Sequence, residues 1–74
     1  MGGGQDSPQS QKINLNRADA WLLAALPDIG QTRAQAIVNY RQKNGPFRST
    51  NELLKVEGIG TAIYDKIKDL ITVD

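Results

Sequence analysis

Four basic residues and no acidic ones lie within residues 31–48 of this 74-residue chain, giving that stretch a charge of +4. They are Arg33, Arg41, Lys43 and Arg48. Residues 1–30 sum to −1 and residues 49–74 to −2, so the whole protein carries only +1. A local block of cations attracts anions such as phosphates, although a solvated surface is the simpler explanation for any single residue.

A glycine turn lies at the start of this block and occurs again thirty residues later. Residues 26–34 read LPDIGQTRA and residues 56–64 read VEGIGTAIY. Each turn precedes a predicted helix, whose first amides have no partner within the helix and carry a partial positive charge. A glycine there lets another surface approach the backbone closely. One such turn alone is most simply a compact corner, but two copies beside a basic block favour phosphate binding.

The composition argues against catalysis. The chain has no cysteine and no histidine, so it lacks the usual ligands of a zinc site and the base of a Ser-His-Asp triad. Its carboxylates are scattered, and no two have a convincing spacing for the metal ions of a nuclease. We therefore predict a binding protein that is not an enzyme and that has no catalytic residues, metal or cofactor.

The turns need helices to hold them, and the first half of the chain predicts two. INLN at residues 13–16 alternates and indicates an extended lead-in. Asp19 is a good N-cap for a short helix over about residues 20–25. A second helix is expected over about residues 31–43, because NGP at residues 44–46 is a strong stop signal.

The second half repeats this plan. STNE at residues 49–52 reads as a capping box that opens a third short helix to about Lys55. The last helix is expected over about residues 61–71, where apolar residues fall on one face. These residues are Ile63, Tyr64, Ile67, Leu70 and Ile71. No segment alternates long enough for a sheet, so the fold is predicted to be all-α.

Equivalent positions of the two halves carry similar residues: Leu23 and Leu53, Ile37 and Ile67, Ile29 and Ile59. The isoleucine in the middle of each turn is expected to point into the core. The first eleven residues, rich in glycine, glutamine and serine, are expected to be a flexible linker or tail, and residues 12–74 a single domain. The sequence contains neither a bilayer-spanning apolar run nor a recognisable signal peptide.

Both turns, with the helices that follow them, resemble the helix-hairpin-helix motif, in the stretches LPDIGQTRAQAIVNYR and VEGIGTAIYDKIKD. Three further segments are similar to segments of the ComEA-type competence proteins: INLNRAD, NGPF and DLITVD. This resemblance implies a tandem helix-hairpin-helix domain of four to five short helices with SAM-like architecture. It further implies binding of DNA through hairpin amides that contact the sugar-phosphate backbone. Double-stranded DNA is expected to be preferred, and binding is expected to be independent of its sequence. The resemblance also implies a DNA receptor outside the cytoplasmic membrane, periplasmic or anchored, that acts with other DNA-uptake proteins and makes no membrane contact through this segment.

Carried over by position, the resemblance predicts two sets of DNA contacts. The first set is Gly30, Gln31, Thr32 and Arg33, and the second is Gly58, Gly60, Thr61 and Ala62. Arg41, Lys43 and Arg48 are expected to extend the phosphate track. Asp28 replaces the first hairpin glycine; its charge opposes a phosphate, and Arg33 offsets it. Tyr64 stands where the motif has a small residue and is expected to fill the core.

Two alternatives concern single residues and the function itself. Trp21 is either a core residue, which its neighbours Leu22 and Leu23 favour, or a platform for base stacking. Lys66 and Lys68 alternate with acids and suggest no more than solubility. A glycosylase, which also uses this motif, needs a base-flipping pocket that this chain is too short to build. The rival function is a non-catalytic protein-interaction or structural module, which has no need of Arg33.

Overall fold

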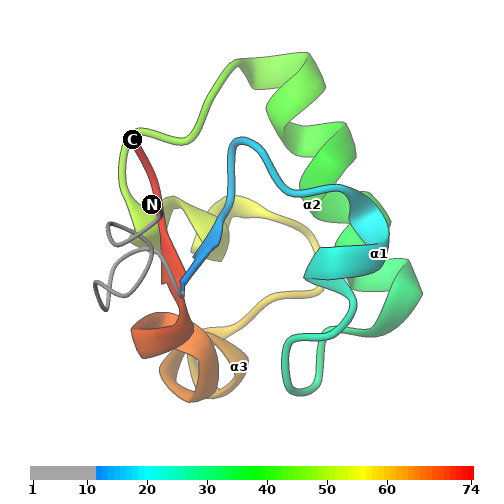
Figure 1. Cartoon of the computed structure of the whole chain (residues 1–74). Helices are drawn as coiled ribbons and strands as arrows, with labels where there is room; N and C mark the ends of the chain where they lie inside the picture. Colours follow the sequence, from blue (N-terminus) through cyan, green and yellow to red (C-terminus); the bar gives the residue numbers. More distant parts are fainter. Residues whose placement is uncertain (1–11) are drawn as a thin grey trace, which may run out of the picture.

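The computed structural model describes residues 12–74, and the predicted linker at residues 1–11 lies outside them. Helices carry most of this part of the chain, which confirms the all-α prediction (Figure 1). The elements in chain order are β1 (Ile13–Asn14), α1 (Ala20–Leu23), α2 (Gly30–Asn44), η3 (Thr50–Lys55), α3 (Thr61–Ile67), η4 (Lys68–Leu70) and β2 (Ile71–Thr72), where η denotes a 3₁₀ helix.

The helix α2 is the longest element and extends one residue beyond the predicted range at each end. It ends within the predicted stop signal, before Gly45, whose amide donates to the carbonyl of Arg41. Its core-facing residues Ala34 and Ile37 are fully buried. The helix α1 is shorter than predicted, and Asp19 precedes it without a side-chain cap. The Asp19 carboxylate instead accepts a hydrogen bond from the indole Nε1 of Trp21, at 3.3 Å.

The predicted capping box is only half formed. The Glu52 carboxylate reaches back to the amide of Arg48 at 3.0 Å, one residue earlier than the motif requires. The Ser49 hydroxyl bonds the Asn51 side chain and leaves the helix start uncapped. The element that follows is the 3₁₀ helix η3 rather than an α-helix.

The prediction of a helix to residue 71 is wrong, because α3 ends at Ile67 and gives way to η4 and β2. The strand β2 pairs in parallel with β1, Ile13 opposite Ile71 and Asn14 opposite Thr72 (Figure 1). The prediction that no segment forms a sheet is therefore wrong, because these two short strands form one. The strand β1 lies in the lead-in that alternation predicts to be extended, whereas the two residues of β2 are too few to produce an alternating pattern.

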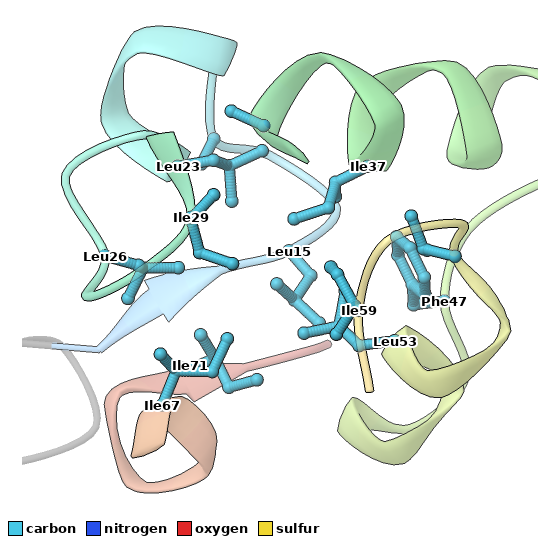
Figure 2. Packing of buried hydrophobic residues seen from close by; sticks show 13 residues of the cluster. Leu15, Leu23, Leu26, Ile29, Ile37, Phe47, Leu53, Ile59, Ile67 and Ile71 are labelled. Atoms are coloured by element: carbon cyan, nitrogen blue, oxygen red, sulfur yellow. The ribbon is translucent and has the colours of Figure 1, made fainter. Parts of the chain in front are cut away.

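Thirteen apolar side chains form the core (Figure 2), and the repeat is visible in it. Every equivalent pair named from the sequence is buried: Leu23 and Leu53, Ile37 and Ile67, Ile29 and Ile59. Tyr64 is half-buried against this core, as expected.

Trp21 is 71% exposed, so the prediction that it belongs to the core is wrong. Successive residues of an α-helix are about 100° apart, and Trp21 and Leu23 therefore face opposite sides of α1. Because Leu23 is buried, Trp21 projects outward. Leu70, also predicted on the apolar face, is 43% exposed because α3 has ended before it.

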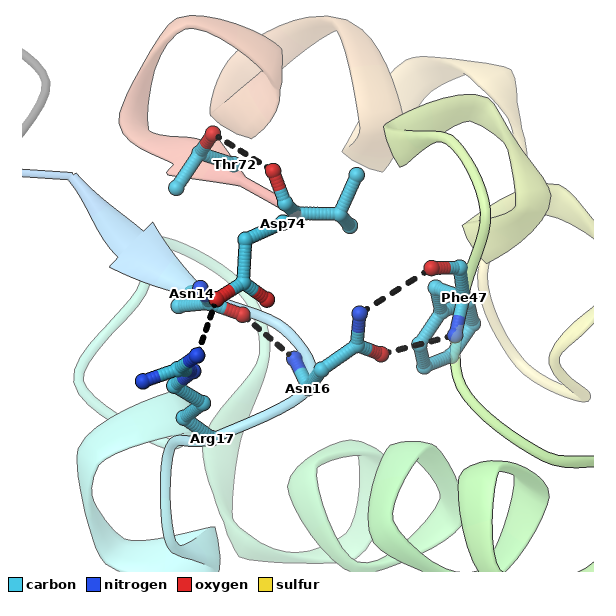
Figure 3. Close-up of polar contacts among 7 residues, drawn as sticks. Asn14, Asn16, Arg17, Phe47, Thr72 and Asp74 are labelled. Atoms are coloured by element: carbon cyan, nitrogen blue, oxygen red, sulfur yellow. Dashed lines mark hydrogen bonds and ion pairs between the residues drawn. The ribbon is translucent and has the colours of Figure 1, made fainter.

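Polar contacts fasten the lead-in to the rest of the fold (Figure 3). The Asn16 side chain donates to the carbonyl of Phe47 at 3.0 Å and accepts from its amide at 2.7 Å. Arg17 forms an ion pair with Asp74. No helix within residues 12–74 has the length and apolar character needed to cross a membrane.

Candidate functional site

The first hairpin joins α1 to α2 through a left-handed turn. Asp28 and Gly30 both have a φ of 64°, and the buried Ile29 lies between them (Figure 2). Aspartate tolerates this region better than most residues, which explains how it replaces a glycine. The amides of Gly30, Gln31 and Thr32 make no hydrogen bond within residues 12–74. All three residues are exposed, so the hairpin offers three backbone donors to solvent.

The second hairpin joins η3 to α3 and differs in one backbone angle. Gly58, the equivalent of Asp28, has a φ of 92°, whereas Gly60 has a φ of −104° that any residue adopts. Ile59 is buried, as predicted (Figure 2). The amides of Gly60, Thr61 and Ala62 also find no acceptor in the described part of the chain. Each half of the repeat thus presents the same kind of donor group.

Two crossed contacts hold the hairpins side by side. Arg33, from the first turn of α2, donates from Nε to the carbonyl of Gly58 at 2.7 Å and from Nη1 to the carbonyl of Asp28 at 3.4 Å. Lys66, from α3, lies with its Nζ 2.6 Å from the carboxylate of Asp28. Each helix therefore supplies a cation to the hairpin of the other half.

The charge of Asp28 is largely matched by Lys66. The hydrogen bond from Lys66 and its positive charge lower the pKa of Asp28 below the usual aspartate value, and the charge of Arg33 adds to this. The carboxylate is therefore ionised at neutral pH. The interpretation of Lys66 as a residue needed only for solubility is wrong, because its partner lies 38 positions away in the other half.

The basic block does not gather around the hairpins. Arg41 uses Nη1 to bond the carbonyls of Leu15 and Ala18, at 2.8 and 2.7 Å, and so fixes the lead-in to α2. Lys43 is exposed near the far end of α2, roughly 18 Å along the helix from Gln31 at 1.5 Å per residue. Arg48 is exposed in the link before η3. Of the four cations, only Arg33 makes a hydrogen bond to a hairpin in the part of the chain that the structure describes.

Three shallow grooves border these elements. One of about 450 Å³ lies between the hairpins and is lined by Thr32, Arg33, Ala36, Glu57 and Gly58. A second of about 340 Å³ brings Lys43 close to Lys55 and Glu57. A third of about 440 Å³ lies between α1 and the start of α2 and includes Trp21. Sequence reasoning missed Lys55 and Glu57 as neighbours of the site, since their positions depend on long-range packing.

Comparison with known proteins gives one family match. The sequence pattern described as the helix-hairpin-helix motif matches residues 8–72, which include both hairpins. The chain is 37% identical over 75 residues to ComE operon protein 1 of Bacillus subtilis, with 97% of this chain and 37% of that protein covered. It is 44% identical over 63 residues to an uncharacterized protein of Haemophilus influenzae, with 84% of this chain and 56% of that protein covered.

A third relative is of a different kind. The mouse endonuclease/exonuclease/phosphatase family domain-containing protein 1 is 34% identical over 61 residues, covering 82% of this chain and 11% of that protein. The chain thus spans little more than half the length of the Haemophilus relative and much less of the other two.

Proposed function

This chain belongs to the helix-hairpin-helix family, as a domain of ComEA type, and from that premise we propose that it binds DNA through its two hairpins. Double-stranded DNA is the preferred ligand, and binding is independent of sequence. The donors are the backbone amides of Gly30, Gln31 and Thr32 in the first hairpin and of Gly60, Thr61 and Ala62 in the second.

One observation carries this proposal: two adjacent hairpins each expose three amides that have no acceptor within residues 12–74, and crossed contacts hold the hairpins together. Amides at a helix start donate to phosphate oxygens, and the partial positive charge there favours the anion. Contacts to phosphate position a protein on DNA without reading bases. Paired hairpins with such donors are therefore suited to the backbones of the two strands.

The charges near the hairpins support weak, sequence-independent binding. Arg33 keeps its positive charge close to both turns, whereas Lys66 is matched by Asp28 and Glu57 adds a negative charge beside Gly58. Lys43 and Arg48, both exposed, extend the contact along the phosphate track at a distance from the hairpins. We leave Arg41 out of the proposed contacts, because its guanidinium is committed to the lead-in.

We extend the proposal to a wider role, which the similarity to ComE operon protein 1 and to the ComEA-type proteins supports. The domain receives DNA during uptake in natural transformation, on the outer side of the cytoplasmic membrane. The whole protein is periplasmic or anchored there and works with other proteins of the uptake machinery. Fractionation of cells that carry the tagged full-length protein tests this location, and recovery in the cytoplasm contradicts it.

Fluorescence anisotropy with a labelled duplex tests the binding itself. We expect a dissociation constant in the range of ~10⁻⁴ to 10⁻⁶ M. Binding should weaken as salt is added, and the slope of the logarithm of the binding constant against the logarithm of the salt concentration should be about −0.9 per phosphate neutralised. A scrambled duplex should bind equally well, and a tenfold preference for one sequence contradicts the proposal. Absence of binding at low salt as well as at high salt favours the rival function, a protein-interaction module.

A further inference from the structure

The exposed Trp21 borders the first hairpin. Its ring lines the groove of about 440 Å³ together with Ala20, Gln31, Thr32 and Gln35. Gln31 and Thr32 are also among the residues at the start of α2 whose amides have no acceptor in the described part of the chain. One groove therefore joins an aromatic face to the phosphate donors of the first hairpin.

A hydrogen bond orients the indole ring of Trp21. Its Nε1 donates to the carboxylate of Asp19, two residues earlier, at 3.3 Å. This contact uses the polar edge of the ring and leaves its faces for other partners. Gln31 and Gln35, which also line the groove, carry side-chain amides, and the Gln35 nitrogen donates to the Asn39 side chain on the same helix at 3.0 Å.

We propose that this groove takes one unpaired base of the DNA, which stacks on Trp21 while the neighbouring phosphate binds the amides of the first hairpin. The inference rests on the proposed function, since the hairpin supplies the phosphate contact. An aromatic ring stacks on any base, and amide side chains can meet the base edge without selecting a sequence. The occupant is unpaired because both faces of a base inside a duplex are covered by its neighbours.

The chain offers a direct probe, because Trp21 is its only tryptophan. Stacking of a base on indole quenches its fluorescence. We expect quenching when single-stranded oligothymidylate is titrated into the protein. A relaxed, covalently closed duplex circle, which has no ends, should bind with much weaker quenching. Equal quenching by both ligands, or none with the single strand, overturns the inference.

Substitution supplies the second measurement. Trp21→Leu removes the aromatic faces, and Trp21→Phe keeps a smaller one. Leu54→Ala is the matched control, since Leu54 is another exposed apolar residue, at 41%. In anisotropy with the single strand we expect Trp21→Leu to bind about tenfold more weakly, Trp21→Phe to retain part of the affinity, and Leu54→Ala to bind normally. A tenfold change is about 1.4 kcal/mol, within the range of one base–aromatic stack.

The closed circle separates the two proposals. If all variants bind it equally and Trp21→Leu also binds the single strand normally, the stacking site is wrong and hairpin binding stands. If the unmodified protein binds neither ligand, the proposed function fails and the stacking site with it. If Leu54→Ala weakens single-strand binding as much as Trp21→Leu, the effect is not specific to the groove and the inference fails.

Discussion

Lys66 lies with its Nζ 2.6 Å from the carboxylate of Asp28, although the two residues belong to different halves of the repeat. Thirty residues after Asp28, Gly58 accepts a hydrogen bond from Arg33 of the other half. The two hairpins are therefore joined by a pair of crossed contacts. Their relative position depends on these contacts as well as on the core beneath them.

Replacing Lys66 tests the contribution of one of these contacts. We expect Lys66→Gln to lower the Tm slightly, because both partners are about half exposed and solvent weakens the pair. Lys68→Gln is the matched control, since within residues 12–74 the only ion pair of Lys68 is with Asp65, three positions earlier, at 3.7 Å. Thermal melts followed by circular dichroism compare the two, and equal Tm values would contradict a role for Lys66 in holding the hairpins together.

The same ion pair predicts how stability depends on pH. The pKa of Asp28 is lowered in the folded protein, chiefly by Lys66, so the unfolded chain takes up a proton first as pH falls. The stabilisation is fully present above the pKa of Asp28 in the unfolded chain, about 3.9. It is lost as pH falls through the lower pKa that Asp28 has in the folded protein. The Tm difference between the protein and Asp28→Asn should therefore shrink below about pH 4. A difference that stays constant down to pH 2 would contradict this.

Removing the charge of Asp28 should strengthen DNA binding. Asp28→Asn keeps a residue that tolerates positive φ, and Asp28→Gly restores the motif's own residue; both free the cation of Lys66. We expect tighter binding and a salt slope steeper by about 0.9, corresponding to one more phosphate neutralised. Anisotropy at several salt concentrations measures both. Weaker binding by both variants would mean that the aspartate is needed to shape the turn.

Arg33 should matter to both stability and binding. From the sequence alone, Arg33→Glu would abolish binding and leave the melt unchanged. The hydrogen bond to Gly58 changes that expectation: we predict loss of DNA binding together with a loss of about 1 kcal/mol or less in the free energy of unfolding. Arg33→Lys keeps the charge but not the Nε contact, so it should lose stability while retaining most of the binding. Unchanged DNA affinity of Arg33→Glu would contradict the proposed interface.

The two hairpin glycines of the second half should respond differently to alanine. Gly58→Ala places a side chain at a φ of 92° and should cost about 1 kcal/mol of stability; its Cβ would meet Arg33 Cγ at an ordinary 3.7 Å. Gly60→Ala meets nothing within 4 Å and has an ordinary φ. It should therefore leave the melt unchanged and weaken DNA binding, because the Cβ holds the phosphate away from the amides. Normal binding by Gly60→Ala would argue against a contact at this hairpin.

The repeated apolar positions made the fold predictable. Spacing alone indicated that Ile29 and Ile59 are buried beneath equivalent turns, and a stop signal located the end of α2. The lead-in that contains β1 was expected to be extended, but its pairing with β2 was missed because the two residues of β2 do not establish a period. The exposure of Trp21 was missed because Trp21, Leu22 and Leu23 are all apolar, and the four residues of α1 are too few to show which face of the helix is buried.

The candidate site was less predictable than the fold. Its residues follow from the motif, but the partners of its charges do not. The sequence around Lys66 indicates a solvated face and that around Arg41 a cation available for phosphate, but their partners in the structure lie 38 and 26 positions away in the chain. A single sequence carries no local signal for such contacts, since they depend on how the two halves pack together.

The pairing of β1 with β2 has a mechanical consequence. The strands run parallel, and Leu15 extends the pair with a further hydrogen bond from its amide to the carbonyl of Thr72, at 2.9 Å. A force that pulls residue 12 away from residue 74 therefore acts along the strands and loads these bonds together in shear. An antiparallel pair pulled at one end would open one bond at a time. The short bridge is thus a clamp that resists stretching of the domain by its two ends.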